Sequence, residues 1–428
     1  MDRRFSNIFP GLSEERAIAL LRTPTHELED KSDRYIAAAH LVNFPSERAI
    51  NALIDTLGDC EADLDSRIAR RKAIETLGRL QASSAIPAIR QCLHDPDIYT
   101  VENAVWAIGE IGTDDETILA EIAELLSDPK QIHRIIIHGL AKLGYRAALD
   151  TILPFTCAED PTVASAAIAT VSRFKNDPSR MPEVVQFLQH PNINARRACI
   201  QDLMDARYYA AMPDIAACPI SMVFRIRGIA HLATTGMATG ELTFAQIEPS
   251  LDAVIRDRPD ELNLVHDYPE PPALDFLINE LYHTDFGRCY LASQAILDLY
   301  PQPAPPALID TFVEKAWNDY GAHYHVIKLL GWLQYEPAYK VLVESLHNKR
   351  PQFQKSRTAA AIALGHLGDK RAIEELKTAG ETPIWELQYA CLMALVQLGD
   401  SSIPQFITED THPLLRAKAN LTANALSL

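Results

Sequence analysis

The sequence has 428 residues, and its 57 acidic and 40 basic side chains give a formal net charge of −17 at pH 7. This acidic balance argues against nucleic acid as a partner, because phosphate backbones attract basic proteins. The N-terminus lacks the apolar core of a signal peptide, and no run of 18 apolar residues offers a membrane span, so we expect a soluble protein. The seven cysteines show no CxxC spacing, and we expect them in a reducing cytosol.

The sequence repeats itself with a period of about 31 residues. Gly78 recurs as Gly109, and Gly368 recurs as Gly399, and both steps are 31 residues (109 − 78 and 399 − 368). Pairs of Asp-Pro or His-Pro recur in the same frame, at Asp95, Asp128, Asp160 and His190. Periods of this size are typical of solenoids built from stacked units.

In chain order, residues 1–32 are expected to form an N-terminal cap, with Ser13 as the N-cap of the first helix. Residues 33–235 then follow as repeats of two helices each, because apolar residues recur at helical spacing, as at Ala69, Ala73, Leu77 and Leu80. We expect the recurring glycines near helix ends, where a left-handed cap costs glycine least.

The period fails over residues 236–311, which are rich in proline, glycine and acidic residues and predict an irregular helical insert or bend. Regular units resume over residues 312–428. The pattern is that of short HEAT-type repeats, and it predicts an all-α fold, a curved α-solenoid that runs as one continuous array. The direction of its curvature is left open.

Some side chains are not required by the packing period. Basic residues form four clusters, which are Arg67, Arg70, Arg71 and Lys72, then Arg196 with Arg197, Arg225 with Arg227, and Lys355 with Arg357. In an acidic protein such clusters favour a site for a small anion. The alternative is a solvated helix face in which, for example, Arg71 pairs with a glutamate one turn further on.

A second set of candidates lies in and just after the irregular stretch. Residues 317–324 read Trp-Asn-Asp-Tyr-Gly-Ala-His-Tyr, and residues 283–290 contain Arg288 between histidine, acidic and aromatic residues. The alternative for Asp319 and Tyr320 is a turn at a helix end, which is also good local chemistry.

Five phrases together resemble those of the E/F-type phycobilin lyases, and within them the long single-chain members that serve the phycoerythrin alpha subunit. They are RFSNIFPGLSEERA, SRIARRKAIETLGRL, CPISMVFRIRG, WNDYGAHY and PQFQKSRTAAAIAL. The phrases that lie outside the repeat consensus are the more specific ones. The resemblance covers nearly the whole chain. It implies covalent attachment of a linear tetrapyrrole, phycoerythrobilin, to a cysteine of a phycobiliprotein alpha subunit in a cyanobacterium. Some relatives also isomerise the pigment to phycourobilin, and the sequence does not separate the two activities.

A bilin needs cations for its two propionates, aromatic walls for its conjugated chain and an acid near its pyrrole nitrogens. On this hypothesis Asp319 holds the pyrrole nitrogens or moves a proton, with Tyr320 and His323 as further proton donors. Trp317 and Tyr324 are candidate walls. The candidate cations for the pigment are Arg67, Arg70, Arg71, Arg288, Lys355 and Arg357.

No prosthetic group and no metal are expected, since His323 and His325 diverge at i, i+2 on a helix and no further ligand cluster accompanies them. The bilin is then a substrate. The competing hypothesis is a HEAT-repeat scaffold or phycobiliprotein chaperone that binds a protein partner without catalysis.

Overall fold

The computed structural model describes residues 11–59, 63–400 and 404–426, and every regular element among them is a helix. The predicted all-α class is therefore confirmed. Contacts within the chain divide it into two compact units, the first ending at Asp177 and the second beginning at Pro178. The predicted segment boundaries at residues 32, 235 and 311 stay predictions.

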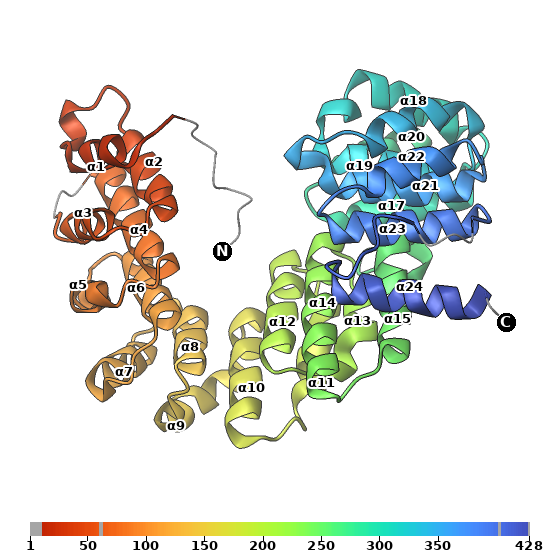
Figure 1. Ribbon diagram of the computed structural model, residues 1–428. Coiled ribbons are helices and arrows are strands. Elements are labelled where there is room, and N and C mark those ends of the chain that lie inside the picture. Colours follow the sequence, from red (N-terminus) through yellow and green to blue (C-terminus); the bar gives the residue numbers. More distant parts are fainter. Residues whose placement is uncertain (1–10, 60–62, 401–403, 427–428) are drawn as a thin grey trace. The chain divides into compact units, whose positions relative to one another are not determined.

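The first unit stacks helices in pairs. α2, α4, α6, α8 and α10 form one row in which each packs on the next, and the helix that precedes each of them packs along its side (Figure 1). Apolar residues fill the contacts between this row and the helices that pack along its side, and Leu53, Ile74 and Ile108 are among those fully buried. The helices are α1 Glu14–Arg22, α2 Asp33–His40, α3 Glu47–Leu57, α4 Leu64–Arg79, α5 Ile86–Gln91, α6 Ile98–Ile111, α7 Glu116–Glu124, α8 His133–Lys142, α9 Leu149–Ile152 and α10 Pro161–Lys175.

The glycines of the repeat have two different roles. Gly368 and Gly399 adopt left-handed backbone angles (φ +77° and +83°), as expected at helix ends. Gly78 lies near the end of α4, as predicted, but it does not adopt the left-handed backbone. A Cβ at Gly78 would stand 2.8 Å from Trp106 and 2.9 Å from the Cα of Ala107. Its small size allows α4 and α6 to approach each other closely.

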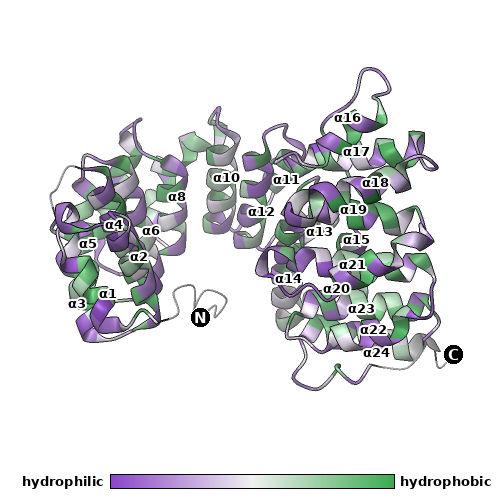
Figure 2. Ribbon diagram, turned by 90° about the horizontal axis from the view of Figure 1, so that it is seen from above, coloured by the Kyte–Doolittle hydropathy of each residue, from purple (hydrophilic) through white to green (hydrophobic). Residues whose placement is uncertain are grey.

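The second unit begins with the same kind of stacking. α12 packs on α14, and α17, α19, α21 and α23 follow one another in a second series that ends with α24. Figure 2 shows hydrophobic and hydrophilic residues interspersed along the individual helices, as expected for helices with one buried face. The helices are α11 Met181–Gln186, α12 Ile193–Asp205, α13 Met212–Ala216, α14 Met222–Thr239, α15 Phe244–Arg256, α16 Leu274–Glu280, α17 Phe286–Leu299, α18 Ala304–Glu314, α19 Tyr320–Trp332, α20 Tyr339–Leu346, α21 Gln354–Leu367, α22 Ala372–Gly380, α23 Trp385–Gln397 and α24 Pro413–Leu426.

The second unit also closes on itself. α15 packs against α21, α23 and α24, and α14 packs against α24, so its last helices lie beside its early ones (Figure 1). Lys418 of α24 bridges Glu248 and Asp252 of α15 at 2.6 and 2.7 Å, and the Tyr389 hydroxyl donates to Asp252 at 2.7 Å. A simple solenoid contacts only its nearest neighbours, and these contacts across more than 130 positions in the chain are an exception to that rule.

Within the described part of the chain, no helix combines the length and the apolar character that crossing a membrane requires.

Candidate functional site

An aspartate lies in the core of the second unit, directly after α15. Asp257 caps this helix with a left-handed backbone (φ 52°), and its N–H donates to the carbonyl oxygen of Ala253 at 2.8 Å. Aspartate adopts this conformation more readily than most other residues that carry a side chain. Its side chain is only 1% exposed, so the turn at the end of α15 places a carboxylate among the surrounding helices.

Four donors from three helices converge on the Asp257 carboxylate. Arg225 of α14 donates to Oδ1, and Tyr290 of α17 donates to Oδ2 at 2.8 Å. Tyr324 and Lys328, one turn apart on α19, also donate to Oδ2. One carboxylate thereby joins the end of α15 to α14, α17 and α19, and it fixes the position of the Tyr324 ring.

This cluster contains two cations and one carboxylate. Burial disfavours an ionised carboxyl group, yet the charges of Arg225 and Lys328 lower the pKa of Asp257 to about 2. Burial lowers the pKa of Lys328 to about 8, although Asp257 opposes that shift. At pH 7 all three groups are charged, and the cluster carries a net positive charge.

Lys355, at the start of α21, lies next to this cluster. Its Nζ is 4.1 Å from the ring centroid of Phe286, 4.4 Å from that of Tyr320 and 5.1 Å from that of Tyr324. Such distances allow cation–π attraction. Burial lowers the pKa of Lys355 to about 7. The structure thus brings three of the predicted residues, Lys355, Tyr320 and Tyr324, together.

The predicted turn before α19 has a definite local role. Asp319 is the N-cap of α19, where its Oδ1 accepts hydrogen bonds from the N–H groups of Gly321 at 2.9 Å and Ala322 at 2.8 Å. Trp317 and Tyr320 on either side of it are 50% and 56% exposed. The helix-end interpretation of this segment therefore describes its local structure, whereas the proposed role of Asp319 in proton transfer stays a prediction.

His323 lies one turn into α19, in contact with aromatic rings. Its ring centroid is 4.5 Å from that of Phe353 and 5.1 Å from that of Phe312, and its Nδ1 is buried without a hydrogen-bond partner. Burial, with the charge of Lys355, lowers the pKa of His323 to about 4. The imidazole is neutral at pH 7, so any proton it donates comes from the neutral ring.

A pocket of about 340 Å³ opens beside His323. Aromatic groups and polar groups both contribute to its walls, which suits a ligand with a flat apolar body and polar substituents. The lining residues are Phe312, Trp317, His323, Glu344, Ser345, Asn348 and Arg350.

The other predicted cations of the second unit already have partners. Arg288 pairs with Glu280 at 2.8 Å. Arg357 is buried, and its Nε donates to the carbonyl oxygen of Leu346 at 2.8 Å. Their roles in binding a pigment stay predictions, and binding through their guanidinium groups would have to compete with these contacts.

The three predicted arginines of the first unit lie on α4. Arg70 pairs with Asp95, and Arg71 pairs with Asp97 at 2.5 Å, so the alternative pairing of Arg71 with the glutamate one turn further on was wrong. Arg67 has a buried Nε that finds no hydrogen-bond partner among the described residues. Because these arginines belong to the first unit, their convergence with Lys355 on one ligand stays a prediction.

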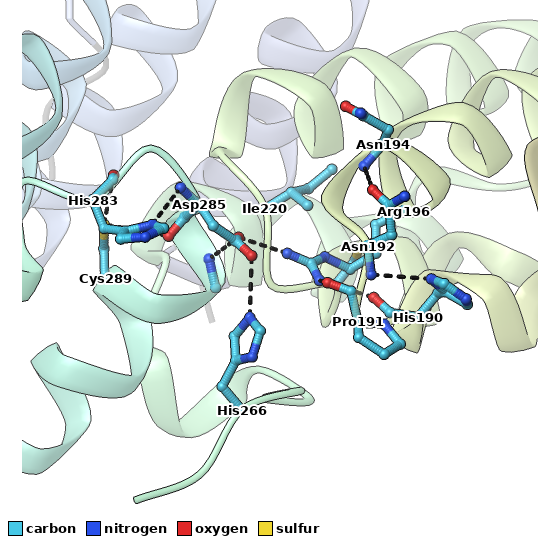
Figure 3. A network of polar contacts seen from close by, with 12 residues as sticks. His190, Pro191, Asn192, Asn194, Arg196, Ile220, His266, His283, Asp285 and Cys289 are labelled. Carbon is cyan, nitrogen blue, oxygen red and sulfur yellow. Dashed lines mark hydrogen bonds and ion pairs between the residues drawn. The ribbon is translucent and has the colours of Figure 1, made fainter.

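A second polar network supports the start of α17 (Figure 3). The buried Arg196 of α12 donates to the carbonyl oxygen of His190 at 2.8 Å and to Asp285 at 2.6 Å. Asp285 is the N-cap of α17 and also contacts His266 at 3.1 Å. Burial opposes ionisation, but these partners lower the pKa of Asp285. The network holds the helix that carries Phe286 and Tyr290.

Sequence reasoning missed Asp257 and Lys328 as members of a site, and it singled out Arg225 only as part of a basic pair. Arg225 was present in the phrase CPISMVFRIRG, and Lys328 lies one turn beyond Tyr324, but Asp257 stands in a proline-rich stretch that predicts only a loop. A weak signal existed in the spacing, because Tyr324 and Lys328 share one face of a helix. Their common partner is 67 positions from Tyr324 in the chain, and no periodicity indicates that contact.

Among the described residues, no group of three or more His, Cys, Asp or Glu side chains is arranged to hold a metal ion. The geometry of the second unit thus offers cations, aromatic rings and a pocket on an all-helical frame.

Comparisons with known proteins agree with this class of fold. The profile of HEAT repeats matches residues 62–123, and that of the PBS lyase HEAT-like repeat matches residues 356–379. The chain is therefore a HEAT-repeat protein of the all-α solenoid class.

Relatives extend over nearly the whole chain. The chain is 52% identical to the uncharacterized phycocyanin operon protein Y of Pseudanabaena tenuis, over 98% of this chain and 100% of that protein. It is 33% identical to the bilin biosynthesis protein CpeY of Synechococcus sp. strain WH8020, over 89% of this chain and 96% of that protein. A solved complex of CpcE and CpcF of phycocyanin lyase from Nostoc sp. PCC7120 shares 27% identity with a TM-score of 0.49, over 57% of this chain and 96% of that one. The chain belongs to the E/F-type phycobilin lyase family.

Proposed function

We propose that the protein attaches a bilin to a cysteine of a phycobiliprotein by forming a thioether bond. The observation that carries this proposal is the similarity over nearly the full length to a protein named for bilin biosynthesis and to one of a phycocyanin operon. In the reaction, the thiol of the acceptor adds across the ethylidene double bond of the pigment. A C–S bond forms, and the thiol proton ends on the tetrapyrrole, so no oxidant or reductant is needed.

Four of the chain's seven cysteines are poorly suited to carry the pigment, which favours direct transfer to the acceptor. Burial raises the pKa of Cys92 to about 11 and those of Cys218, Cys289 and Cys391 to about 12. These four groups stay thiols at neutral pH, and a thiol is a poor nucleophile compared with a thiolate. The reacting sulfur is therefore proposed to come from the partner protein, without an intermediate bound to one of these four cysteines.

The site of the second unit matches the needs of such a substrate. A bilin presents an extended conjugated chain with two carboxylates. The pocket beside His323 is lined in part by the half-exposed Trp317, and Tyr320, also exposed, follows it in the chain. Holding the pigment and the acceptor together contributes to catalysis by lowering the entropy cost of their encounter, by about 7 kcal/mol or more in ideal cases. Orientation also determines which face of the pigment the thiol attacks.

The resemblance of the sequence phrases favours a particular pigment and partner. We propose phycoerythrobilin as the substrate and the alpha subunit of phycoerythrin as the acceptor. Isomerisation to phycourobilin during attachment is a second activity that the same site can support, since it requires only a proton moved between carbons. No prosthetic group takes part in this scheme.

Co-expression tests the proposal. The chain is produced with a phycoerythrobilin-synthesising pathway and with the alpha subunit of either phycoerythrin or phycocyanin, and the product is denatured before its absorbance is read. Colour that survives denaturation on the phycoerythrin subunit, and that disappears when the acceptor cysteine is replaced, supports attachment. The absorbance maximum separates retained phycoerythrobilin from phycourobilin. Colour that is lost on denaturation supports the scaffold or chaperone hypothesis instead.

A further inference from the structure

Lys355 differs from the other predicted cations of the second unit in having neither a hydrogen-bond partner nor an ion-pair partner. Within residues 11–59, 63–400 and 404–426, its Nζ makes no hydrogen bond and no ion pair, whereas Arg288 and Arg357 both have partners. An ammonium group that leaves water normally gains a carboxylate or several acceptors. The close contacts of the Lys355 ammonium are instead with the faces of aromatic rings.

Three aromatic rings surround Lys355, and one of them is exposed to solvent. Tyr324 is fixed, because its hydroxyl donates to the buried Asp257, and Phe286 is buried at the start of α17. Tyr320 is the third wall, and it is 56% exposed. Lys355 itself is only partly buried, so a group from solvent can reach its ammonium beside the ring of Tyr320.

The charges near Lys355 leave an excess of positive charge. Lys328 of α19 repels it, while Asp257 after α15 and Asp319 before α19 attract it from beyond ion-pair distance. Cys289 of α17 faces it as a neutral thiol, since burial raises the pKa of that thiol to about 12. Asp257 is already paired with Lys328 and with a second cation, Arg225. The carboxylates present do not neutralise this region.

The histidines of α19 add no negative charge. His325 is fully buried, neither of its ring nitrogens has a hydrogen-bond partner, and burial holds its pKa well below the usual value. His323, whose pKa is lowered to about 4, is neutral as well. A guest that brought one carboxylate to Lys355 would therefore meet a cation and neutral rings.

We propose that Lys355 and the rings of Phe286, Tyr320 and Tyr324 form a binding site for a carboxylate of a flat conjugated ligand. This inference rests on the proposed function, and under that function the carboxylate is one propionate of the bilin. The ammonium donates a charge-assisted hydrogen bond to the carboxylate, and the exposed ring of Tyr320 packs on the conjugated system. The Asp257 cluster acts as a positioning element, because it fixes the Tyr324 wall.

Binding of a carboxylate must be linked to protonation of Lys355. In the protein without ligand, the pKa of Lys355 is about 7. Below pH 7 the ammonium is therefore already charged, and the affinity for the carboxylate does not change with pH. Above pH 7 each unit of pH lowers the affinity about tenfold, because a proton must be taken up with the ligand. The fall ends at the higher pKa that the lysine acquires in the complex.

The test compares phycoerythrobilin with its dimethyl ester, which lacks both negative charges. Binding of each pigment to the full-length protein is measured by visible absorbance from pH 6 to 9. The affinity of the acid divided by that of the ester cancels other titrations of the pigment. For the unmodified protein this ratio is expected to be at least about 10 to 100 at pH 6, the usual range for one charge-assisted hydrogen bond, and to fall above pH 7. Lys355→Gln should lower this ratio at pH 6 by about 10- to 100-fold and remove its fall above pH 7, whatever the second propionate contributes, and Lys355→Arg should keep the ratio high and remove its pH dependence.

Lys370→Gln serves as the matched control, because Lys370 is an exposed lysine that follows shortly after α21. This replacement should leave the acid-to-ester ratio unchanged. An acid-to-ester ratio that is the same in the unmodified protein and in Lys355→Gln, with no change above pH 7, overturns this inference while the proposed function stands. Absence of binding for both pigments in the unmodified protein overturns the proposed function and the inference together. The ratio measured on the unmodified protein does not depend on whether any variant folds.

Discussion

Replacing Asp257 by asparagine removes the negative charge from the centre of the second unit and keeps the shape of the side chain. The asparagine Oδ1 can still accept from Tyr290 and Tyr324, so the neutral hydrogen bonds survive in part. The two cations lose their counter-ion while buried, at 0% exposure for Arg225 and 3% for Lys328. Breaking a buried ion pair in this way costs about 3 to 5 kcal/mol of unfolding free energy.

The two cations share this cost unequally. Lys328 can avoid an unpaired charge by releasing its proton. Its pKa is about 8 with Asp257 in place, and the loss of that carboxylate lowers it, so deprotonation at pH 7 costs less than about 1.4 kcal/mol in the variant. Arg225 cannot deprotonate, although it keeps the carbonyl oxygens of Ala216 at 2.8 Å and Ile220 at 3.1 Å. Adding Lys328→Met to Asp257→Asn should therefore recover about 1 kcal/mol and no more.

The assay is urea unfolding followed by tryptophan fluorescence in a Trp106→Phe background, which leaves Trp317, Trp332 and Trp385 as reporters, all in the second unit. Asp267→Asn, an exposed aspartate of the loop that follows Asp257, is the control and should change the unfolding free energy by less than about 0.5 kcal/mol. A loss below about 1 kcal/mol for Asp257→Asn, or an equal loss for the control, would refute the assignment of Asp257 as the counter-charge of the cluster.

Three further changes test other parts of the structure. Asp319→Asn should keep the helix cap and the stability, whereas Asp319→Ala should lower the unfolding free energy by about 0.5 to 2 kcal/mol in thermal unfolding. A lower yield of coloured product with asparagine would support a role of Asp319 in proton transfer, and an unchanged yield would leave it only the role of a helix cap. Gly78→Ala should destabilise the first unit by about 1 to 3 kcal/mol in urea unfolding, because the added Cβ would clash at 2.8 Å with the neighbouring helix. At Gly58 the nearest atom to an added Cβ is 3.5 Å away, so Gly58→Ala should destabilise the unit less, and equal effects would contradict the close-approach argument. Lys418→Ala should speed hydrogen exchange in α24 and α15, since its two carboxylate partners lose their cation; unchanged exchange would show that apolar packing alone closes the unit.

The sequence predicted the helical repeats because their cause is local. A helix with one apolar face and a period near 31 residues leaves its pattern in the order of the residues, and the all-α class follows from it. The role of Gly78 was not predictable in the same way. A glycine near the end of a repeat suits a left-handed cap or a close helix contact, and only the position of Ala107 in the neighbouring helix decides between them.

The candidate site shows the same division. Tyr320, Tyr324 and Lys355 were predicted from their chemistry and from phrases outside the repeat consensus, and the structure places them side by side. The Asp257 cluster was not predicted, because its members come from three helices and a loop, and their contact depends on how the second unit packs. Ion pairs such as that of Arg71 with Asp97 were missed for a related reason: the partner lies on the next repeat.

The packing of α15 against α21, α23 and α24 has a consequence for how such proteins can vary in length. An open array tolerates the gain or loss of a repeat, since each end is free. A ring of helices has no free end, and one hairpin more or less between α15 and α24 would move Lys418 away from Glu248 and Asp252. Duplication and deletion of repeats should therefore be confined to the first unit, and the second should behave as a module of constant size.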